Sequence, residues 1–223
     1  MVSLLGVKIS HTYHFFKALK EVSLELQKGE CYALFGPNGA GKTTLMKIFA
    51  TLLQPTEGSV SIMGKDSVHD KEEARRFLFF MGHRSFLYDD LTAVENIEFA
   101  IGLRGWLPTL GEIKTVLDHV GIGPYAYKKT RYLSAGMQKR LSLAKAILAE
   151  PELLLLDEPY ASLDEKGIDI LNESIRDFLK KGTSVLISSH DRMKTAEVAN
   201  RAGILYNKGL REIPISELSH ALF

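Results

Sequence analysis

A glycine-rich segment near the N-terminus has the residue types and spacing of a phosphate-binding loop. It fits the pattern G-x-x-x-x-G-K-[ST] and consists of Gly36, Pro37, Asn38, Gly39, Ala40, Gly41, Lys42 and Thr43. Its glycines let backbone N–H groups turn toward phosphate oxygens, and the helix that follows adds the positive end of its dipole. Lys42 can place its charge on the β- and γ-phosphates, Thr43 can bind Mg²⁺, and Thr44 can reach the α-phosphate. The segment therefore predicts a nucleotide site.

Two carboxylates follow an apolar strand in the second half of the chain. Residues 153–156 are all leucine, and Asp157 and Glu158 come directly after them. An acid at the carboxyl end of such a strand lies beside the nucleotide in a parallel sheet. We expect Asp157 to hold Mg²⁺ through water and Glu158 to polarise the attacking water. The alternative is a pair of solvated acids that end a strand.

A second helix start with anion-binding character lies between these two motifs. Ser134 and Gly136 occur in the segment Leu133-Ser134-Ala135-Gly136-Met137-Gln138. A helix start of this kind is a good phosphate site. Because one phosphate loop already serves the nucleotide, the second site makes sense if it faces the nucleotide of another subunit. The alternative is that Ser134 only caps its helix.

Taken together, these motifs resemble those of ABC transporter ATPases. The phosphate loop, the Ser134-Ala135-Gly136 signature and Asp157-Glu158-Pro159 follow one another in that family's order. Ala161-Ser162-Leu163-Asp164 matches the family's D-loop, and His190 matches its switch histidine. Tyr13 lies where the family places the aromatic residue that stacks on adenine. The resemblance covers nearly the whole chain.

The resemblance implies an α/β fold of the P-loop NTPase class: an ABC-type ATPase core with a β-rich N-terminal subdomain and an inserted helical subdomain. It implies ATP and Mg²⁺ as cofactors and ATP hydrolysis by a dimer of ATPase subunits. Each site would take Ser134 and Gly136 from one subunit and, from the other, Lys42, Thr43, Asp157, Glu158 and His190. Asp164 would lie at the dimer interface. The partners would be transmembrane permease subunits, and the chain would be cytoplasmic, peripheral on the inner face of the cell membrane.

Three of the matched residues have local alternatives. Tyr13 could be a packed loop aromatic, with Phe15 or Phe16 stacking on adenine in its place. His190 could cap the strand before it, and Asp164 could be a simple helix N-cap. Only the contacts of these side chains can separate the alternatives.

Departures from the family pattern narrow the resemblance. His83 stands in place of the Q-loop glutamine, and Ala135 and Met137 replace the usual second glycine and final glutamine of the signature. Gly82-His83 and the bulky Tyr160 are similar to the ATPase of the cytochrome c maturation (haem exporter) system. The resemblance would place His83 at the magnesium shell or the attacking water, where a neutral imidazole could still accept a hydrogen bond. The alternative for His83 is an ordinary polar loop residue.

Two other functions compete with the haem exporter type. One is the ATPase of another exporter, for a drug, a lipid or a polysaccharide. The other is a non-transport ABC ATPase that works on DNA or at a division complex. The second is disfavoured because no heptad run or cysteine cluster separates Lys42 from Ser134.

The elements that must position these residues alternate between strands and helices. Apolar or alternating patterns predict strands over residues 2–10, 22–26, 31–35, 60–63, 153–156 and 184–188 and a hairpin over 203–213. Helical patterns cover residues 42–53, 70–77, 92–103, 110–120, 141–149 (continuing from the Ser134 start), 167–181 and 194–200. We expect one domain, 1–223, with an α/β core over about 1–84 and 150–223 and a helical subdomain over about 85–149.

The composition excludes several classes of protein. The 223 residues are 45% hydrophobic and 25% charged, which is typical of a globular chain and excludes a wholly disordered one. A net charge of +1 gives no field that favours nucleic acid, so no nucleic acid partner is expected. The only cysteine, Cys31, is expected in the core, and it favours a reducing compartment. We expect no signal peptide and no membrane-spanning segment.

Overall fold

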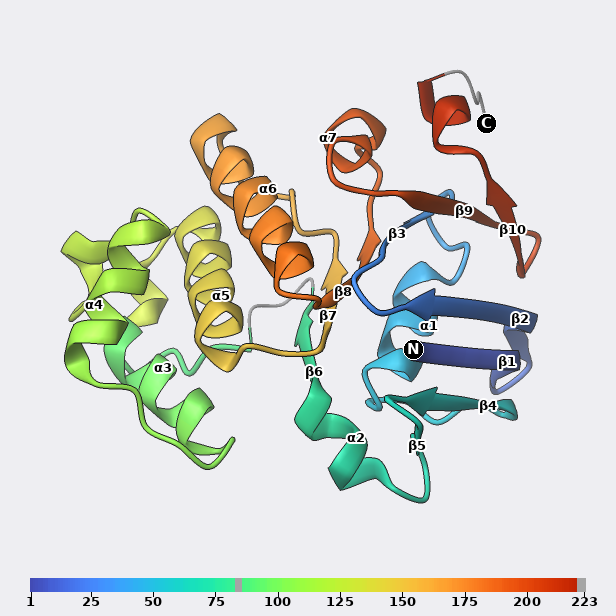
Figure 1. The fold of residues 1–223 in the computed structure, drawn as a ribbon, viewed down its shortest axis with the longest axis horizontal. Helices are drawn as coiled ribbons and strands as arrows, with labels where there is room; N and C mark the ends of the chain where they lie inside the picture. The colour runs from blue at the N-terminus through green and yellow to red at the C-terminus, as the bar shows by residue number, and fades with distance from the viewer. Residues whose placement is uncertain (83–85, 220–223) are drawn as a thin grey trace. The chain divides into compact units, whose positions relative to one another are not determined.

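The computed structural model describes residues 1–82 and 86–219. The chain forms two compact units (Figure 1). The first comprises Met1–Phe80, Pro151–Glu158 and Ile175–Phe223, and the second comprises Met81–Glu150 and Pro159–Ser174. Residues 159–174, which the sequence analysis assigned to the α/β core, therefore group with the helical unit.

A six-stranded sheet carries the acidic strand end and the phosphate loop. Its order is β10-β9-β3-β8-β7-β6. The strands are β3 (Cys31–Phe35), β6 (Leu78–Met81), β7 (Leu153–Asp157), β8 (Ser184–Ser188), β9 (Arg201–Tyr206) and β10 (Gly209–Ile213). The pairs β3–β8, β3–β9 and β7–β8 are parallel, whereas β9 and β10 form an antiparallel hairpin. All residues of β3, β7 and β8 are buried, which explains the apolar segments at their centres, residues 31–35, 153–156 and 185–187.

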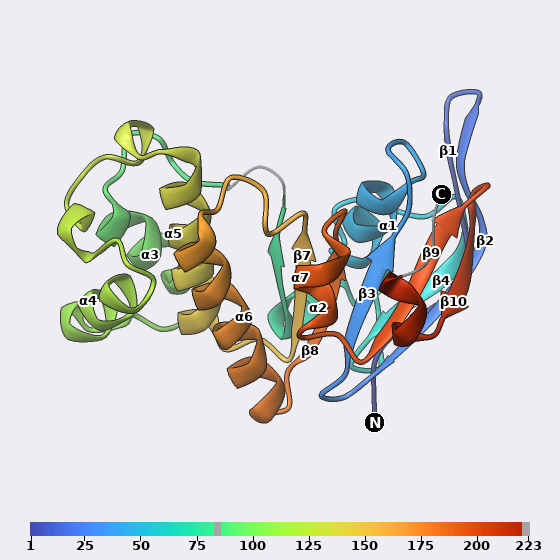
Figure 2. The same ribbon diagram turned by 90° about the horizontal axis from the view of Figure 1, so that it is seen from above.

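A four-stranded antiparallel sheet forms the β-rich part of the first unit. It consists of β1 (Val2–Tyr13), β2 (Phe16–Gln27), β4 (Glu57–Ile62) and β5 (Lys65–Asp66), in the order β2-β1-β4-β5. Figure 2 shows β1 and β2 as a long hairpin. The same unit contains the helices α1 (Lys42–Phe49), α2 (Lys71–Phe77) and α7 (Arg192–Ala196) and the 3₁₀ helix η3 (Ile215–Ser219).

Helix α1 packs its apolar face into the main core of the first unit. Leu45, Ile48 and Phe49 are fully buried there with leucines from both sheets. The prediction that this helix continues to residue 53 is wrong. Thr51 has a φ of 57°, so the chain turns away, and the N–H groups of Leu52 and Leu53 both donate to the carbonyl of Lys47.

Helices make up most of the second unit. They are α3 (Ala93–Gly102), α4 (Leu110–His119), α5 (Ala135–Ala149), the first part of α6 (Glu165–Lys180), and the 3₁₀ turns η1 (Gly123–Tyr125) and η2 (Thr130–Tyr132). Helix α3 starts at a capping box in which Thr92 and Glu95 satisfy each other's backbone N–H groups. Buried Asn96 then fastens the preceding loop by donating to the carbonyls of Tyr88 and Leu91.

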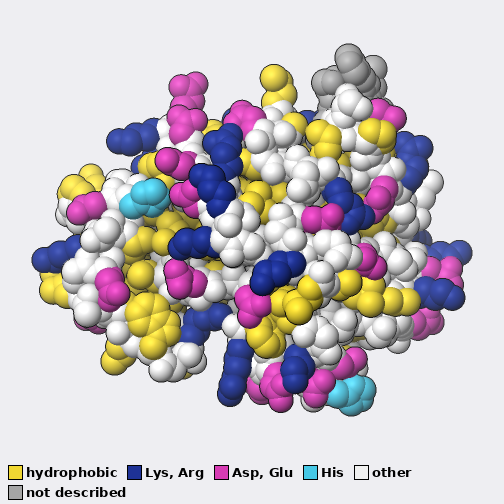
Figure 3. All heavy atoms as spheres, in the orientation of Figure 1, with side chains coloured by type: hydrophobic (Ala, Val, Ile, Leu, Met, Phe, Trp, Pro, Cys, Tyr) yellow, Lys and Arg dark blue, Asp and Glu magenta, His cyan; other side chains and the backbone are white. Residues whose placement is uncertain are grey.

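Several predicted elements are confirmed and others are corrected. Strands 31–35 and 184–188 have the predicted bounds, and α5 starts after Ser134 as expected. Helix α7 ends at Ala196 instead of residue 200, and the sequence analysis missed β5 and β6. None of the helices in the described ranges is both long and apolar enough to cross a membrane. On the face shown in Figure 3, basic and acidic side chains are interspersed, in keeping with the small net charge.

Candidate nucleotide site

The phosphate loop connects β3 to α1, and its backbone requires glycine. Gly41 has a φ of 104°, and a Cβ atom there would lie 2.9 Å from the carbonyl oxygen of Ala18. A Cβ atom on Gly36 would lie 2.5 Å from the carbonyl oxygen of Leu205. No side chain fits at these positions without a backbone shift, so the loop keeps a fixed, close-packed path. The three residues at its tip, Pro37, Asn38 and Gly39, are exposed.

Lys42 holds its ammonium group against the carbonyls of its own loop. Its Nζ donates to the carbonyl oxygens of Gly36 at 2.7 Å and Pro37 at 3.3 Å, although the residue is only 7% exposed. Burial lowers the pKa of Lys42, and the nearby carboxylates of Glu158 and Asp157 oppose this shift. The result is a preorganised cation at the start of α1, suited to an anionic ligand.

One carboxylate oxygen of Asp157 accepts a hydrogen bond, and within the described part of the chain the other is free to bind a ligand. The residue is 1% exposed at the end of β7, directly opposite Ser188 in the parallel register. The Ser188 hydroxyl donates to Oδ1, whereas Oδ2 is buried and accepts no hydrogen bond from any described residue. Because a buried, unpaired carboxylate oxygen is costly, it fits a cation or a cation-bound water. Ser188 is a functional candidate that the sequence analysis did not single out.

Glu158 is held in a rare backbone conformation. Its φ is 50°, and its N–H donates to the carbonyl of Ser188 at 3.0 Å. A left-handed conformation of a residue other than glycine costs on the order of 1–3 kcal/mol. It directs the side chain so that Oε1 lies 3.1 Å from Nε2 of His190.

His190 connects the acid to the phosphate loop. Its Nε2 lies 3.2 Å from Nζ of Lys42 as well as close to Glu158. The structure thus brings Lys42, Asp157, Glu158 and His190 together at the carboxyl ends of β7 and β8, and we call these residues the acid–lysine cluster. The capping alternative for His190 does not describe these contacts.

Tyr13 contacts the residue that follows the phosphate loop. Its hydroxyl lies 3.4 Å from Oγ1 of Thr44, and its ring remains partly exposed. Phe15 is fully exposed at the hairpin tip, and the Phe16 ring lies 5.7 Å from the Nζ atom of Lys208. Of the three aromatic candidates, Tyr13 is the one with a contact to α1.

The signature residues and the D-loop pack on each other within the second unit. Ser134 caps α5 by accepting a hydrogen bond from the N–H of Met137 at 3.2 Å. A Cβ atom on Gly136 would lie 2.6 Å from the carbonyl oxygen of Ser162, so the close approach of the D-loop requires glycine. Asp164 accepts from the Arg140 guanidinium and from the N–H of Gly167.

The contacts of Asp164 match its local alternative, the N-cap. Its hydrogen bond with the Arg140 side chain lowers the pKa of this carboxyl. Arg140, which also donates to the carbonyl of Val120, is a residue that the sequence analysis did not single out. His83 lies outside the described residues.

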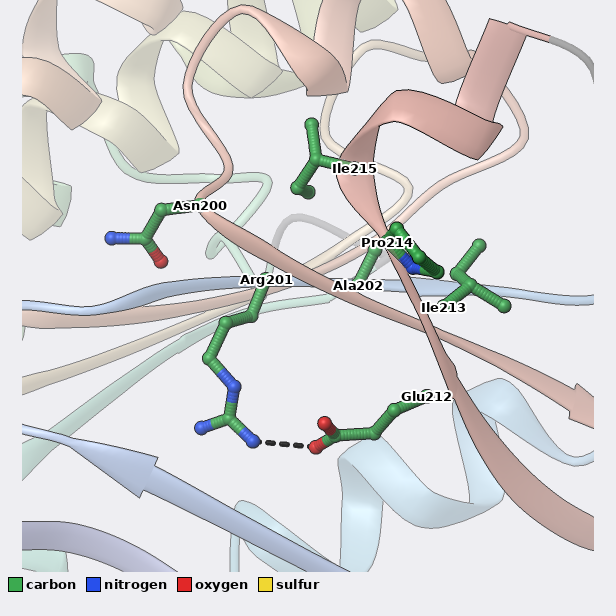
Figure 4. Close-up of a pocket in the computed structure, with 7 residues that line it drawn as sticks. All are labelled: Asn200, Arg201, Ala202, Glu212, Ile213, Pro214 and Ile215. Carbon is green, nitrogen blue, oxygen red and sulfur yellow. Dashed lines mark hydrogen bonds and ion pairs between the residues drawn. The ribbon is translucent and has the colours of Figure 1, made fainter.

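A pocket of about 380 Å³ on the first unit is separate from these residues (Figure 4). Arg201 crosses it and pairs with both Glu212 and Glu30. Asn200 accepts from the N–H of Cys31. Because Arg201 is already paired with these two glutamates, we assign no ligand to this pocket.

The described residues alone do not build a complete metal centre. Residues 1–82 and 86–219 contain no group of three His, Cys, Asp or Glu side chains able to hold a metal ion. Mg²⁺ is ordinarily bound by one or two carboxylates together with water and substrate phosphates. The single free oxygen of Asp157 and the exposed Thr43 hydroxyl fit a Mg²⁺ ion of that kind.

Comparisons with known proteins agree with this geometry. Residues 19–161 match the sequence model of the ABC transporter family. The uncharacterized ABC transporter ATP-binding protein YcbN of Bacillus subtilis (strain 168) is 35% identical over 205 residues, or 92% of this chain and 66% of YcbN. The bacitracin transport ATP-binding protein BcrA of Enterococcus faecalis is 36% identical over 209 residues, which are 90% of this chain and 65% of BcrA.

The relatives include import proteins as well. The sulfate/thiosulfate import ATP-binding protein CysA 1 of Agrobacterium fabrum (strain C58 / ATCC 33970) is 32% identical over 212 residues, which are 92% of this chain and 61% of CysA 1. This chain therefore spans 61–66% of the length of these three curated relatives.

A solved structure extends the likeness to nearly the whole fold. The ATP-binding cassette MJ0796, solved as a dimer in a post-hydrolysis state with ADP and Pi, superposes with a TM-score of 0.84 and 27% sequence identity. The superposition covers 95% of this chain and 98% of the cassette. Because the sequence match spans more than half of the chain and the structural likeness almost all of it, the chain belongs to the ABC transporter family and is an ATPase domain of that family.

Proposed function

We propose that this ATPase domain binds MgATP at the phosphate loop and hydrolyses it at the acid–lysine cluster, as one of two ATPase subunits that drive a transmembrane permease. The observation that carries the proposal is the buried Asp157, whose Oδ2 lacks a hydrogen-bond partner among the described residues beside the Lys42 loop. Mg²⁺ requires a carboxylate oxygen, and the phosphates of ATP require a cation such as the lysine ammonium group. MgATP needs both at one place.

Each residue of the cluster has a distinct task in this proposal. Lys42 holds the β- and γ-phosphates, while Thr43 and Asp157 hold Mg²⁺, which neutralises phosphate charge when bound. Glu158 polarises the attacking water. His190 hydrogen-bonds the γ-phosphate and keeps Glu158 oriented, which its 3.1 Å contact with that carboxylate supports. Tyr13 stacks on adenine, and Thr44 binds the α-phosphate.

The second subunit supplies the remaining contacts to each nucleotide. We assign Ser134 and Gly136 to the ATP held by the opposite subunit and Asp164 to the interface. The exposed Ser134 at the start of α5 supports this assignment, as does the dimer of the related cassette. Bound ATP then joins the subunits, and hydrolysis releases them. The two subunits need not be identical.

The direction and cargo of transport are finer hypotheses. We propose export of the haem exporter (cytochrome c maturation) type, which rests on His83 in the sequence and on Tyr160. In the structure the Tyr160 hydroxyl donates to Oδ1 of buried Asn172, so packing accounts for this tyrosine by itself. The relatives serve different cargoes and do not single out haem. The ATPase of another exporter, for a drug, a lipid or a polysaccharide, is therefore the second candidate.

The proposed place of work is the cytoplasmic face of the cell membrane, on the permease. His83 at the Q-loop position would contact the permease or the attacking water. Co-purification of the chain with its membrane partners and their identification tests the location and separates the two exporter hypotheses. Partners that carry a cargo other than haem would contradict the first hypothesis.

The Glu158→Gln variant tests the proposal most directly. If Glu158 acts on water and not on ATP, the variant keeps its affinity for ATP and loses turnover by more than about 100-fold. Unhydrolysed ATP should then hold two chains together in size-exclusion chromatography with MgATP.

Glu152→Gln is the matched control, because Glu152 lies just before the strand that ends at Asp157. It should keep normal turnover. Normal ATP hydrolysis by Glu158→Gln would contradict the role of Glu158. A variant that binds ATP but stays monomeric at high concentration would contradict the dimer.

A further inference from the structure

The tyrosine proposed to stack on adenine rests on a buried histidine. Tyr13 ends β1 and is 40% exposed, whereas His11 on the same strand is only 7% exposed. Their ring centroids are 4.5 Å apart with an interplanar angle of 78°, which is an edge-to-face contact. Alternate residues of a strand share a face, so this contact follows from the positions of the two residues in β1.

Tyr13 is therefore held at two points. Its ring packs on His11, and its hydroxyl lies 3.4 Å from Oγ1 of Thr44 on α1. An exposed aromatic residue without such supports would lose rotamer freedom when a base stacks on it. With both supports, part of that entropy is already lost before the ligand binds.

His11 is itself fixed by its surroundings. Its Nδ1 lies 3.5 Å from Oγ1 of Thr56, which also accepts a hydrogen bond from the N–H of Thr12 at 3.1 Å. The backbone of Thr56 is tied to the same strand, because its N–H donates to the carbonyl of Ser10 at 2.9 Å. The contact with Thr56 and the burial of His11 hold its ring in place beside Tyr13.

We infer that His11 is a positioning residue for adenine recognition, which orients the Tyr13 ring so that the base of the nucleotide binds to a preorganised surface. The inference rests on the proposed function, because it assumes that Tyr13 stacks on adenine. It assigns His11 no contact with the phosphates.

A probe without a base separates this role from a structural one. Inorganic tripolyphosphate carries the phosphates of ATP but nothing that can stack on Tyr13. In calorimetric titrations, His11→Ala should bind ATP about 2- to 10-fold more weakly than the wild type, the range of one aromatic pair. Its affinity for tripolyphosphate should be unchanged. His11→Phe keeps the ring contact and should restore most of the ATP affinity.

Two further variants complete the design. His14→Asn changes an exposed histidine of the same hairpin and should leave both affinities unchanged. In a Tyr13→Ala background, His11→Ala should have no further effect on ATP binding, because the residue that it positions is gone.

Equal losses for ATP and tripolyphosphate in His11→Ala would overturn the inference, since His11 would then support the whole site. Unchanged ATP affinity in a folded His11→Ala protein would overturn it as well, and so would a His11→Phe protein that binds ATP as weakly as His11→Ala. A wild type that binds neither probe would instead contradict the proposed function, and the inference would fall with it.

Discussion

Both units bury lysine side chains, and Lys42 of the first unit has surroundings different from those of Lys145 of the second. Lys42 of the first unit lies among loop carbonyls, the His190 ring and the charges of Glu158 and Asp157. Lys145 of the second unit is 6% exposed and donates to the carbonyl of Phe86, and burial alone lowers its pKa to about 8. Lys42 therefore lies among groups that can take part in a reaction, whereas Lys145 is only buried.

The acids of the two units differ in the same way. Asp157 keeps a buried oxygen without a hydrogen-bond partner in the described part of the chain, and Oε1 of Glu158 lies 3.1 Å from Nε2 of His190. Asp164 of the second unit is instead committed to Arg140 and to the start of α6. The comparison teaches that the first unit carries groups able to do chemistry, whereas the second carries groups that fix the shape of a surface.

Replacement of Lys42 should give the largest effect and tests the chemical half of the comparison. A hydrogen bond from a charged group contributes about 1.5–3 kcal/mol, so Lys42→Ala should bind ATP about 10- to 100-fold more weakly. Turnover should fall by more than about 100-fold, because the γ-phosphate charge is no longer stabilised. Titration with ATP and a phosphate-release assay measure the two effects.

Lys47→Ala is the control, because Lys47 lies on the same helix but is exposed. Its ATP affinity and turnover should match the wild type. A folded Lys42→Ala protein with wild-type turnover would remove Lys42 from the chemistry and with it the contrast between Lys42 and Lys145.

Lys145 should affect how the free energy of unfolding depends on pH, and it should not affect the turnover of ATP. Its folded pKa of about 8 lies below its ordinary value of 10.5, so the unfolded chain binds more protons between these values. The wild type should therefore gain stability as pH rises through 8, by about 1.4 kcal/mol between pH 7 and pH 9. Lys145→Met should lack this gain.

Urea unfolding of both proteins across this range measures the difference. Burial raises the pKa of Cys31 to about 12, which opposes the gain above pH 9, but Cys31 is common to both proteins and cancels in their difference. If stability changed with pH in the same way for wild type and Lys145→Met, burial would not lower the pKa of Lys145.

The elements that could be predicted from the sequence are those whose burial gives a clear local pattern of apolar residues. Strands β3 and β8 are buried on both faces; β3 is an unbroken apolar run, and β8 has three apolar residues, 185–187, between two serines. The end of α1 could not be predicted, because Leu52 and Leu53 continue its apolar pattern although the chain has turned at Thr51. Strand β6 was missed because no glycine or proline separates it from α2.

The candidate site shows the same limit. The motif spacing predicted Lys42, Asp157, Glu158 and His190, which the structure brings together. The hydrogen bond between Ser188 and Asp157 depends on β8 lying beside β7, and no local pattern encodes that strand order. Because alternate residues of a strand share a face, the sequence places His11 and Tyr13 on the same side of β1. Only the three-dimensional structure shows that their rings are in contact.

The smallest expected effect comes from replacing Ser134. It tests whether a surface residue of the second unit binds the nucleotide or only stabilises its helix. Its hydroxyl accepts the N–H of Met137, so Ser134→Ala should lose about 1 kcal/mol of stability through the missing cap. Glycine is nearly as good as serine at this position, and Ser134→Gly should lose only about 0.3 kcal/mol. Both substitutions remove the hydroxyl proposed to reach the ATP of the opposite subunit.

The pair therefore separates capping from phosphate binding. If Ser134 acts on the opposite nucleotide, both variants should lose turnover to a similar extent, about 3- to 10-fold for one hydrogen bond of ordinary strength, although their stabilities differ. If Ser134 only caps α5, turnover should follow stability, and Ser134→Gly should hydrolyse ATP like the wild type. Urea unfolding together with phosphate release at saturating MgATP distinguishes these outcomes, and normal turnover by Ser134→Gly would confine the chemistry to the first unit.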